Sequence, residues 1–156
     1  MNIRVGQGYD SHALVENIPL YVGGYHIDSP IGCKGHSDGD CLLHALIDCL
    51  LGALGEGDIG TWFPDNDPAY KGIRSTELLS AVLNSSRIAK FEFINLDITL
   101  FLNQPKMKAH REGIKSSLSD LLALDASRIN IKAKTWEGFS CDGVMSASVT
   151  GLISLL

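Results

Sequence analysis

The sequence predicts an α+β protein, with a mostly antiparallel sheet and helices packed on one face of it. Two observations support this prediction. Several segments alternate between apolar and polar side chains, as strands do, and others repeat their apolar residues every three or four positions, as amphipathic helices do. Their order along the chain is a hairpin, two helices, a strand, a helix and two further strands. A length of 156 residues fits one domain with one core, so residues 1–156 are assigned to a single domain.

Strand elements open the chain. Residues 3–12 alternate between two faces and predict a strand, in which Gly6 and Gly8 indicate that another backbone approaches closely. Residues 20–27 predict a β-hairpin, because two short apolar segments flank Gly23-Gly24 and both glycines can adopt a positive φ.

Two helices follow, separated by a long loop. Residues 40–54 carry a broad stripe of leucines and predict a well-buried helix, with polar residues before it that can cap its first turn. Residues 55–72 are rich in Gly, Pro and Asp. A loop of this length in a small domain is usually functional or disordered, and its aromatic residues argue against disorder. Residues 75–89 predict the second helix.

The second half of the chain supplies one more helix and three strands. Residues 91–102 alternate regularly and predict a strand. Pro105 then stands in the favoured first-turn position of a third helix. Residues 129–135 and 144–155 predict the last two strands.

Composition and charge restrict the classes of function. A net charge of -5 argues against nucleic acid as the main partner, because that binding depends on Lys and Arg neutralising phosphates. A small anionic substrate is not excluded, since a metal can make one site positive in an acidic protein. The four cysteines form no C-x-x-C pair, the chain opens with no signal-like segment, and no apolar run reaches membrane-spanning length. We therefore expect a protein of a reducing, cytoplasm-like compartment with neither a nucleic-acid nor a membrane partner.

Asp10, His12 and His44 are the strongest candidates for metal ligands. Residues two apart on a strand point to the same side, so Asp10 and His12 can converge on one ion. Alone, this pair is typical of a solvated strand edge, and His44 alone would be a half-buried histidine with a satisfied ring. Together they give three ligands and leave the fourth tetrahedral position open for a substrate, which is the pattern of a catalytic zinc site.

Three further polar segments are candidates for substrate contacts. Residues 57–67 combine glycines with three aspartates that can face a polyhydroxylated substrate or assist a cation, or form an ordinary turn-rich loop. Residues 103–107 lead into a helix N-terminus whose free N–H groups and lysine can receive an anion or a base edge, although a plain capped helix start has the same pattern. Residues 132–137 end a strand with a hydroxyl and a carboxylate that suit phosphate and a second metal, or form an exposed strand edge.

Taken together, these segments make the chain similar to the 2-C-methyl-D-erythritol 2,4-cyclodiphosphate synthase family of the non-mevalonate isoprenoid pathway. The resemblance spans nearly the whole chain, and its HSDGD-x-x-x-H and GDIG-x-x-FPD blocks are highly specific. The matching motifs are Gly6-x-Gly8-Tyr9-Asp10-x-His12, Gly23-Gly24, His36-Ser37-Asp38-Gly39-Asp40-x-x-x-His44-Ala45, Leu51-Gly52-Ala53, Gly57-Asp58-Ile59-Gly60-x-x-Phe63-Pro64-Asp65-x-Asp67-Pro68 and Pro105-Lys106-Met107.

The resemblance implies a phosphorus–oxygen lyase. The family substrate is 4-diphosphocytidyl-2-C-methyl-D-erythritol 2-phosphate, whose 2-phosphate attacks the β-phosphorus, so that CMP leaves and a cyclic diphosphate forms. Zinc is expected on Asp10, His12 and His44, and a second divalent ion, magnesium or manganese, on Glu137. Because the phosphate is itself the nucleophile, no strong general base is required.

The resemblance also implies roles for single residues. His36 and Thr135 match residues assigned to transition-state stabilisation, and Ser37 is expected to hold phosphate. The erythritol portion is expected to contact Asp58, Ile59, Gly60, Phe63, Pro64 and Asp65. The cytidine pocket is expected to involve Pro105, Lys106, Met107, Lys134 and Thr135, and further substrate contacts are expected from Asp10, His12, Trp136, Glu137 and Phe139.

A homotrimer is implied as well, with active sites between neighbouring subunits, so that the cytidine side comes from an adjacent chain. The last predicted strand is consistent with close approach of sheets, because small hydroxyl side chains occupy one of its faces, although a solvated face is the plain alternative. The implied location is cytoplasmic, and a plastid location would require a leader missing from this chain.

Two departures from the family pattern concern residues 134–144. The family usually has threonine where Lys134 stands, and residues 137–144 are two shorter than the family loop, with Asp142 where an arginine is expected. These departures leave the zinc ligands unchanged. They affect the phosphate contacts near the loop and the binding of any isoprenoid at the trimer axis.

Two other functions make different predictions. A zinc phosphodiesterase would activate water on a nucleotide diphosphate and give a linear product. A zinc-stabilised trimeric binding protein for prenyl diphosphates would show no turnover. The GDIG-x-x-FPD block suits a polyol-binding loop better than a hydrolase.

Overall fold

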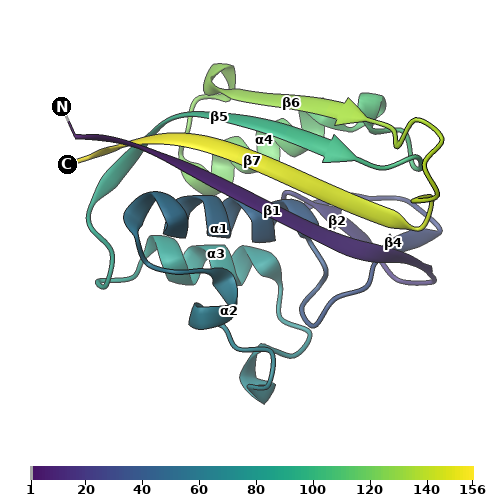
Figure 1. The fold of residues 1–156 in the computed structure, drawn as a ribbon, viewed down its shortest axis with the longest axis horizontal. Helices are drawn as coiled ribbons and strands as arrows, with labels where there is room; N and C mark the ends of the chain where they lie inside the picture. Colours follow the sequence, from purple (N-terminus) through teal and green to yellow (C-terminus); the bar gives the residue numbers. More distant parts are fainter. Residues whose placement is uncertain (1) are drawn as a thin grey trace.

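The protein folds around a five-stranded sheet with helices on one side of it (Figure 1). The structure is a computed structural model and describes residues 2–156. The strand order in the sheet is β4-β1-β7-β5-β6, and the two remaining strands, β2 and β3, form a separate hairpin. The strands are β1 (Ile3–Glu16), β2 (Leu20–Val22), β3 (Tyr25–Ile27), β4 (Ile31–Cys33), β5 (Phe91–Phe101), β6 (Ile129–Lys134) and β7 (Val144–Leu155).

The sheet is mixed, and the prediction of a mostly antiparallel sheet is wrong on this point. Strand β7 pairs antiparallel with both β1 and β5, and β4 pairs antiparallel with β1, but β6 runs parallel to β5. The reason is the helix between β5 and β6, which returns the chain to the end of the sheet where β5 began, as a crossover connection requires. The α+β class and the helical layer agree with the prediction (Figure 1).

Three helices of two or more turns form the helical layer of the described chain. They are α1 (Cys41–Leu54), α3 (Ser75–Leu83) and α4 (Arg111–Leu122). Shorter turns are α2 (Ile59–Trp62), η1 (Pro68–Tyr70), η2 (Met107–Ala109) and η3 (Ala126–Arg128). None of the helices in residues 2–156 is long and apolar enough to cross a membrane.

Helix α1 is the centre of the core and packs directly on β1. A Cβ atom placed on Gly6 would lie 1.9 Å from the carbonyl oxygen of Cys49, and one on Gly8 would lie 1.8 Å from that of Ala45. Only glycine therefore allows the helix backbone to come this close to the strand, and the predicted close approach is confirmed. The consequence for function is that α1 is held at a fixed position over the middle of β1.

The buried carboxylate of Asp40 joins the β2–β3 hairpin to the start of α1. It is fully buried and accepts hydrogen bonds from the backbone N–H groups of Gly23, Gly24 and Leu43 at 2.9, 2.7 and 2.9 Å. Burial raises its pKa, although the three N–H donors oppose that effect. The predicted capping of this helix is confirmed, and the cap also fixes the hairpin.

Several boundaries differ from the prediction. The helix expected over 75–89 ends at Leu83, where Asn84 closes the last turn through a hydrogen bond from its amide to the Ser80 carbonyl. The helix expected to begin at Pro105 begins at Arg111, because a separate turn, Met107–Ala109, intervenes. Strand β4 was not predicted, since three residues are too few for an alternating pattern.

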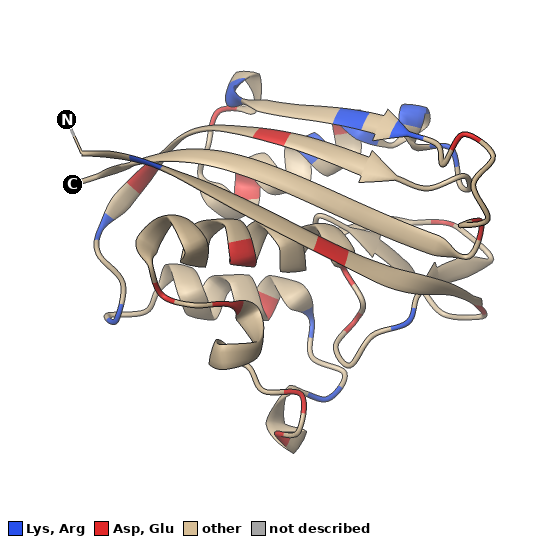
Figure 2. Cartoon of the chain, viewed as in Figure 1, with Lys and Arg blue, Asp and Glu red and all other residues tan. Residues whose placement is uncertain are grey.

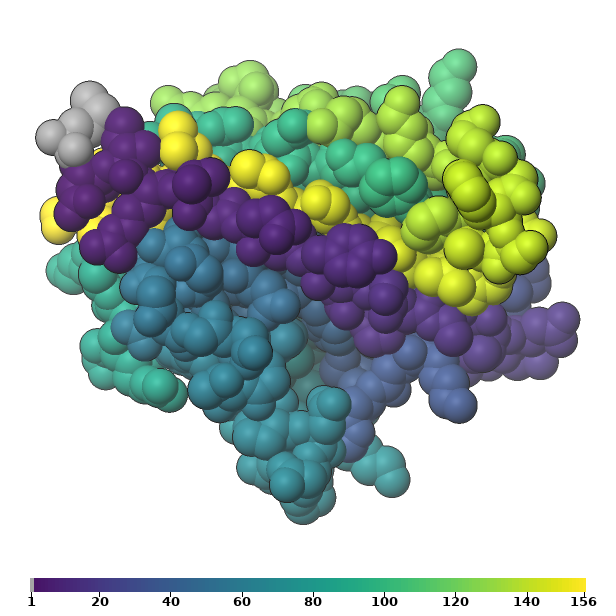
Figure 3. All heavy atoms as spheres, in the orientation of Figure 1, coloured from purple at the N-terminus to yellow at the C-terminus, as the bar shows by residue number. Residues whose placement is uncertain are grey.

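Charged residues of both signs are spread over most elements of the fold (Figure 2). On the side of the sheet away from the helices, β1, β7 and β5 form one continuous surface (Figure 3). Several large apolar side chains of this surface are exposed, with Ile3, Val5 and Tyr9 at 43%, 66% and 54%.

Candidate metal centre and pocket

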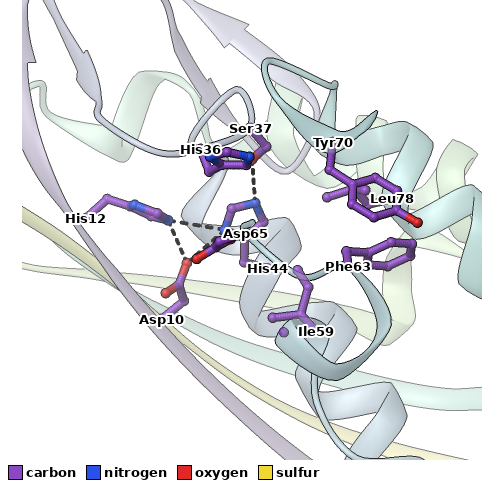
Figure 4. A pocket seen from close by; sticks show the side chains of 11 residues that line it. Asp10, His12, His36, Ser37, His44, Ile59, Phe63, Asp65, Tyr70 and Leu78 are labelled. Atoms are coloured by element: carbon purple, nitrogen blue, oxygen red, sulfur yellow. Dashed lines mark hydrogen bonds and ion pairs between the residues drawn. The ribbon is translucent and has the colours of Figure 1, made fainter. Parts of the chain in front are cut away.

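Strand β1 and helix α1 bring Asp10, His12 and His44 together (Figure 4). Asp10 and His12 lie two residues apart on the face of β1 that α1 covers, and His44 lies at the first turn of α1. Oδ2 of Asp10 is 2.8 Å from Nε2 of His12 and 3.1 Å from Nδ1 of His44, and the two histidine nitrogens are 3.1 Å apart. Within residues 2–156 this is the one group of three or more His, Cys, Asp or Glu whose ligand atoms converge in this way.

The distances fit a tetrahedral zinc ion. Zinc bonds to nitrogen and oxygen of roughly 2.0–2.1 Å place two tetrahedral ligands roughly 3.3 Å apart. The three observed separations, 2.8, 3.1 and 3.1 Å, are close to that edge length. Two imidazoles and one carboxylate are also a donor set that zinc accepts, whereas magnesium prefers oxygen ligands alone.

The ring of His12 is oriented for this role. Its Nδ1 donates to the main-chain carbonyl of Lys34 at 2.9 Å, so Nδ1 carries a proton and Nε2 is left to face the cluster. Such a hydrogen bond from the second ring nitrogen is the usual way a protein fixes a metal-binding histidine.

The charges of the cluster stabilise one another. Burial opposes ionisation of Asp10, but hydrogen bonds and charge attraction from His12 and His44 hold the pKa of its carboxyl well below the usual range. Burial likewise opposes protonation of His12, but the Asp10 carboxylate raises the pKa of the imidazole above its ordinary value. A cation at this position would replace the proton that His12 holds between the two groups.

A pocket of about 210 Å³ opens beside the cluster (Figure 4). Five of its lining residues were predicted from the sequence to bind metal or phosphate, namely Asp10, His12, His36, Ser37 and His44, and a sixth, Asp65, was predicted to contact the erythritol portion. Ile59, Gly60 and Phe63 line it as well, as the resemblance implied, while Asp58 and Pro64 do not. Asp58 instead caps α2, where its carboxylate accepts from the backbone and hydroxyl of Thr61, each at 2.7 Å.

The remaining predicted residues lie elsewhere in the chain and do not line this pocket. Thr135, Trp136, Glu137 and Phe139 follow β6, and the 105–107 segment follows β5 at the same end of the sheet. Lys106 and Lys134 are exposed, whereas Met107 is only 3% exposed and belongs to the core. One chain therefore carries two separate groups of predicted residues.

The residues that follow β6 contact one another and the end of β5. The Thr135 hydroxyl donates to the Glu137 carboxylate at 2.5 Å, and the Trp136 ring stacks on Phe101 with ring centres 5.4 Å apart. Asn103 accepts from the backbone of Trp136 at 2.9 Å and donates to the carboxylate of Asp142. Asp142 thus ties the shortened loop to the end of β5.

Sequence reasoning missed three residues near the cluster. Tyr70 and Leu78 line the pocket, and Ser75 lies 2.9 Å from Nε2 of His44. Tyr70 was noted only as evidence against disorder of the loop. Ser75 and Leu78 were assigned to a helix, and no local pattern showed that the start of α3 meets α1 at His44.

Comparison with known proteins connects this geometry to a family. The model of the YgbB family matches residues 3–153. The chain belongs to the YgbB family. Proteins of similar sequence carry the name 2-C-methyl-D-erythritol 2,4-cyclodiphosphate synthase. The protein from Bordetella pertussis is 47% identical over 100% of this chain and 98% of its own length, and that from Koribacter versatilis is 44% identical over 97% of each. A relative from Arabidopsis thaliana, 48% identical over 86% of this chain and 58% of its own, is named chloroplastic.

Solved structures of the family agree with the fold. A 2C-methyl-D-erythritol-2,4-cyclodiphosphate synthase of 43% identity superposes with a TM-score of 0.87 over 97% of this chain and 100% of the other. The bifunctional IspDF of Campylobacter jejuni, 38% identical, superposes with a TM-score of 0.92 over 99% of this chain and 43% of its own. The family resemblance implied by the motifs is confirmed.

Proposed function

We propose that this protein is the cyclodiphosphate synthase of isoprenoid precursor biosynthesis, and that it converts 4-diphosphocytidyl-2-C-methyl-D-erythritol 2-phosphate to the 2,4-cyclodiphosphate and CMP. The single observation that supports this most is the convergence of Asp10, His12 and His44 beside an open pocket, in a chain 47% identical over its whole length to a protein of that name. Three protein ligands leave one position of a tetrahedral zinc for a phosphate oxygen.

The chemistry proposed is intramolecular phosphoryl transfer. Zinc held by Asp10, His12 and His44 would supply positive charge to the β-phosphate of the substrate. The side chains of the chain position the 2-phosphate in line with the β-phosphorus and neutralise the charge that spreads over the oxygens. The new bond joins the 2-phosphate oxygen to the β-phosphorus, the bond from that phosphorus to the α-phosphate breaks, and CMP leaves with its electron pair.

Some residues of the pocket are placed to bind the phosphates of the substrate, and others to bind its polyol. His36 and Ser37 lie on the rim beside the cluster and can donate hydrogen bonds to phosphate oxygens. Asp65 and the backbone of Gly60 can bond the erythritol hydroxyls, while Phe63 bounds the other side of the cavity. Asp58 contributes indirectly, since it caps the short helix α2 that carries Gly60.

The second group of residues is proposed to act from a neighbouring subunit. Thr135 and Glu137 would then face the diphosphate, and Glu137 would be the protein ligand of magnesium or manganese. The segments around Lys106 and Lys134 would hold the cytidine. One carboxylate is enough for such an ion, because magnesium usually takes most of its other ligands from substrate phosphates and water. The exposed apolar sheet face with Ile3, Val5 and Tyr9 supports a trimer built through the sheets.

Phosphorus NMR of the reaction tests the proposal directly. With the cytidylyl substrate, zinc and magnesium, we expect the signals of CMP and of a cyclic diphosphate in equal amounts. Running the reaction in oxygen-18 water separates cyclisation from hydrolysis, because cyclisation takes no oxygen from solvent. A linear phosphate product containing solvent oxygen would instead identify a phosphodiesterase, and binding without turnover would identify a binding protein.

A further inference from the structure

Ser75 and Asp38 lie behind His44, on the side of the ring away from the cluster. Nε2 of His44 is 2.9 Å from the hydroxyl oxygen of Ser75, and that hydroxyl is 2.5 Å from Oδ1 of Asp38. Ser75 is fully buried, and the Asp38 side chain is only 7% exposed. The three groups therefore form a continuous chain of hydrogen bonds that is shielded from water.

The direction of each hydrogen bond in this chain follows from proton counting. An ionised carboxylate only accepts, so the single hydroxyl proton of Ser75 is donated to Asp38. The Ser75 oxygen is then left to accept, and its partner at 2.9 Å is Nε2 of His44. Nε2 therefore carries a proton, and when a metal takes the place of the proton that Nδ1 shares with Asp10, the ring presents the Nδ1 lone pair to that metal, beside Asp10 and His12.

Arg74 completes the arrangement on the far side of Asp38. Its Nε donates to Oδ2 of Asp38 at 2.8 Å, so the two carboxylate oxygens have separate partners and Oδ1 remains directed at Ser75. The guanidinium also lies 3.9 Å from the centre of the Tyr21 ring, which restricts its movement. The Asp38 carboxylate is therefore held in place by Arg74, with Oδ1 as the acceptor that the chain of hydrogen bonds requires.

We propose that Ser75, with Asp38 behind it, is the positioning residue that fixes His44 as an Nδ1 metal ligand. This inference rests on the zinc site of the proposed function and deepens it. Ser37, whose hydroxyl is also 2.9 Å from Nε2, is not needed for this purpose, because Ser75 already accepts the one proton that Nε2 carries. The Ser37 hydroxyl proton is thereby free to be donated into the pocket, which Ser37 lines and Ser75 does not.

Zinc affinity, measured by competition with a chelator, tests the proposal. Outer partners of metal-binding histidines typically contribute about 10–100-fold in metal affinity, so Ser75→Ala should weaken zinc binding by that factor. Asp38→Asn, which keeps the size of the side chain and removes its charge, should weaken binding in the same direction by a smaller factor. The matched control is Ser37→Ala, which removes the other hydroxyl near Nε2 and should change zinc affinity by less than about threefold.

A second measurement excludes a general loss of structure. In the zinc-loaded protein labelled with nitrogen-15, the Nε2–H of His44 should give a signal protected from exchange with water, and Ser75→Ala should abolish the protection while Ser37→Ala retains it. If Ser75→Ala keeps both the zinc affinity and the protected signal, the positioning role is wrong while the zinc site stands. If the unmodified protein binds no zinc, the proposed function and this inference fail together.

Discussion

At the scale of single residues, the site depends on three side chains that come from two elements. Asp10 and His12 could be paired from their spacing on a strand, and His44 could be added because an imidazole on a leucine-rich helix needs partners. Ser75 could not be found this way. Its role depends on the start of α3 lying against α1, and nothing in the sequence around Ser75 encodes that contact.

We predict that alanine at Asp10, His12 or His44 abolishes zinc binding and activity together, because each side chain supplies one of three ligands. Metal content per chain, measured after dialysis by atomic emission, should fall from one zinc to less than about a tenth. His26→Ala is the matched control, since this exposed histidine lies on the hairpin outside the cluster and should leave one zinc in place. One tightly held zinc in His44→Ala would show that the ligand assignment is wrong.

At the scale of elements, the position of the metal site is set by the packing of α1 on β1. The alternating pattern of residues 3–12 and the leucine stripe of 40–54 predicted both elements, and the two glycines predicted that they touch. The parallel pairing of β6 with β5 was not predicted, because strand direction depends on where the connecting helix returns the chain. Patterns local to a segment determine its type, while its neighbour in the sheet is decided by the whole fold.

We predict that Gly8→Ala displaces α1 from β1 and destabilises the protein by about 2–4 kcal/mol, since the new Cβ would lie 1.8 Å from the Ala45 carbonyl oxygen. Zinc binding should weaken in the same variant, because α1 carries His44 and β1 carries the other two ligands. Denaturant unfolding of the zinc-free protein gives the first quantity and chelator competition the second.

Gly52→Ala, on helix α1 itself, should have the opposite effect on stability. Gly52 lies inside α1, is exposed, and would place its Cβ 3.9 Å from the nearest atom, the carbonyl oxygen of Gln7. Alanine there should stabilise the helix by about 0.5–1 kcal/mol, because glycine loses more backbone freedom on folding. Equal effects of the two substitutions would contradict the close-packing explanation.

At the scale of the whole molecule, the two groups of predicted residues lie in different parts of the chain and do not share one pocket. The pocket beside Asp10, His12 and His44 lies between β1, α1 and the loop after α1, while Thr135 and Glu137 follow β6 at the far edge of the sheet. A trimer with shared sites would bring the two groups together. Motifs matched to a family can assign both groups, but they cannot show which chain supplies each.

Subunit mixing tests this arrangement. His44→Ala and Glu137→Ala should each be inactive alone. In trimers assembled at random from equal amounts of the two, about a quarter of the sites combine an intact zinc half with an intact Glu137 half, so about a quarter of the unmodified activity should return. Light scattering at micromolar concentration should give a trimer. No recovery in mixed trimers would place both groups in sites of a single chain and contradict the proposal.

Asp142 leads to a prediction about the trimer axis. If the loop that carries it meets its two copies there, as the resemblance implies, three carboxylates replace three guanidinium groups, and like charges disfavour a bound diphosphate. Calorimetric titration with farnesyl diphosphate should show poor binding to the unmodified protein and tighter binding to Asp142→Arg. One ligand bound tightly per unmodified trimer would refute this prediction.

The pairing of β1 with β7 also places the two chain ends side by side. Ile3 lies opposite Ser154, and the backbone N–H of Leu155 donates to the carbonyl of Asn2 at 3.0 Å (Figure 1). Asp10 is eight residues further along β1, roughly 25 Å away at the usual rise of a strand. The fold is therefore suited to modular fusion, because another catalytic unit can be appended at either end without obstructing the metal pocket. The bifunctional Campylobacter protein, in which the matched region makes up 43% of the chain, is an instance of that modularity.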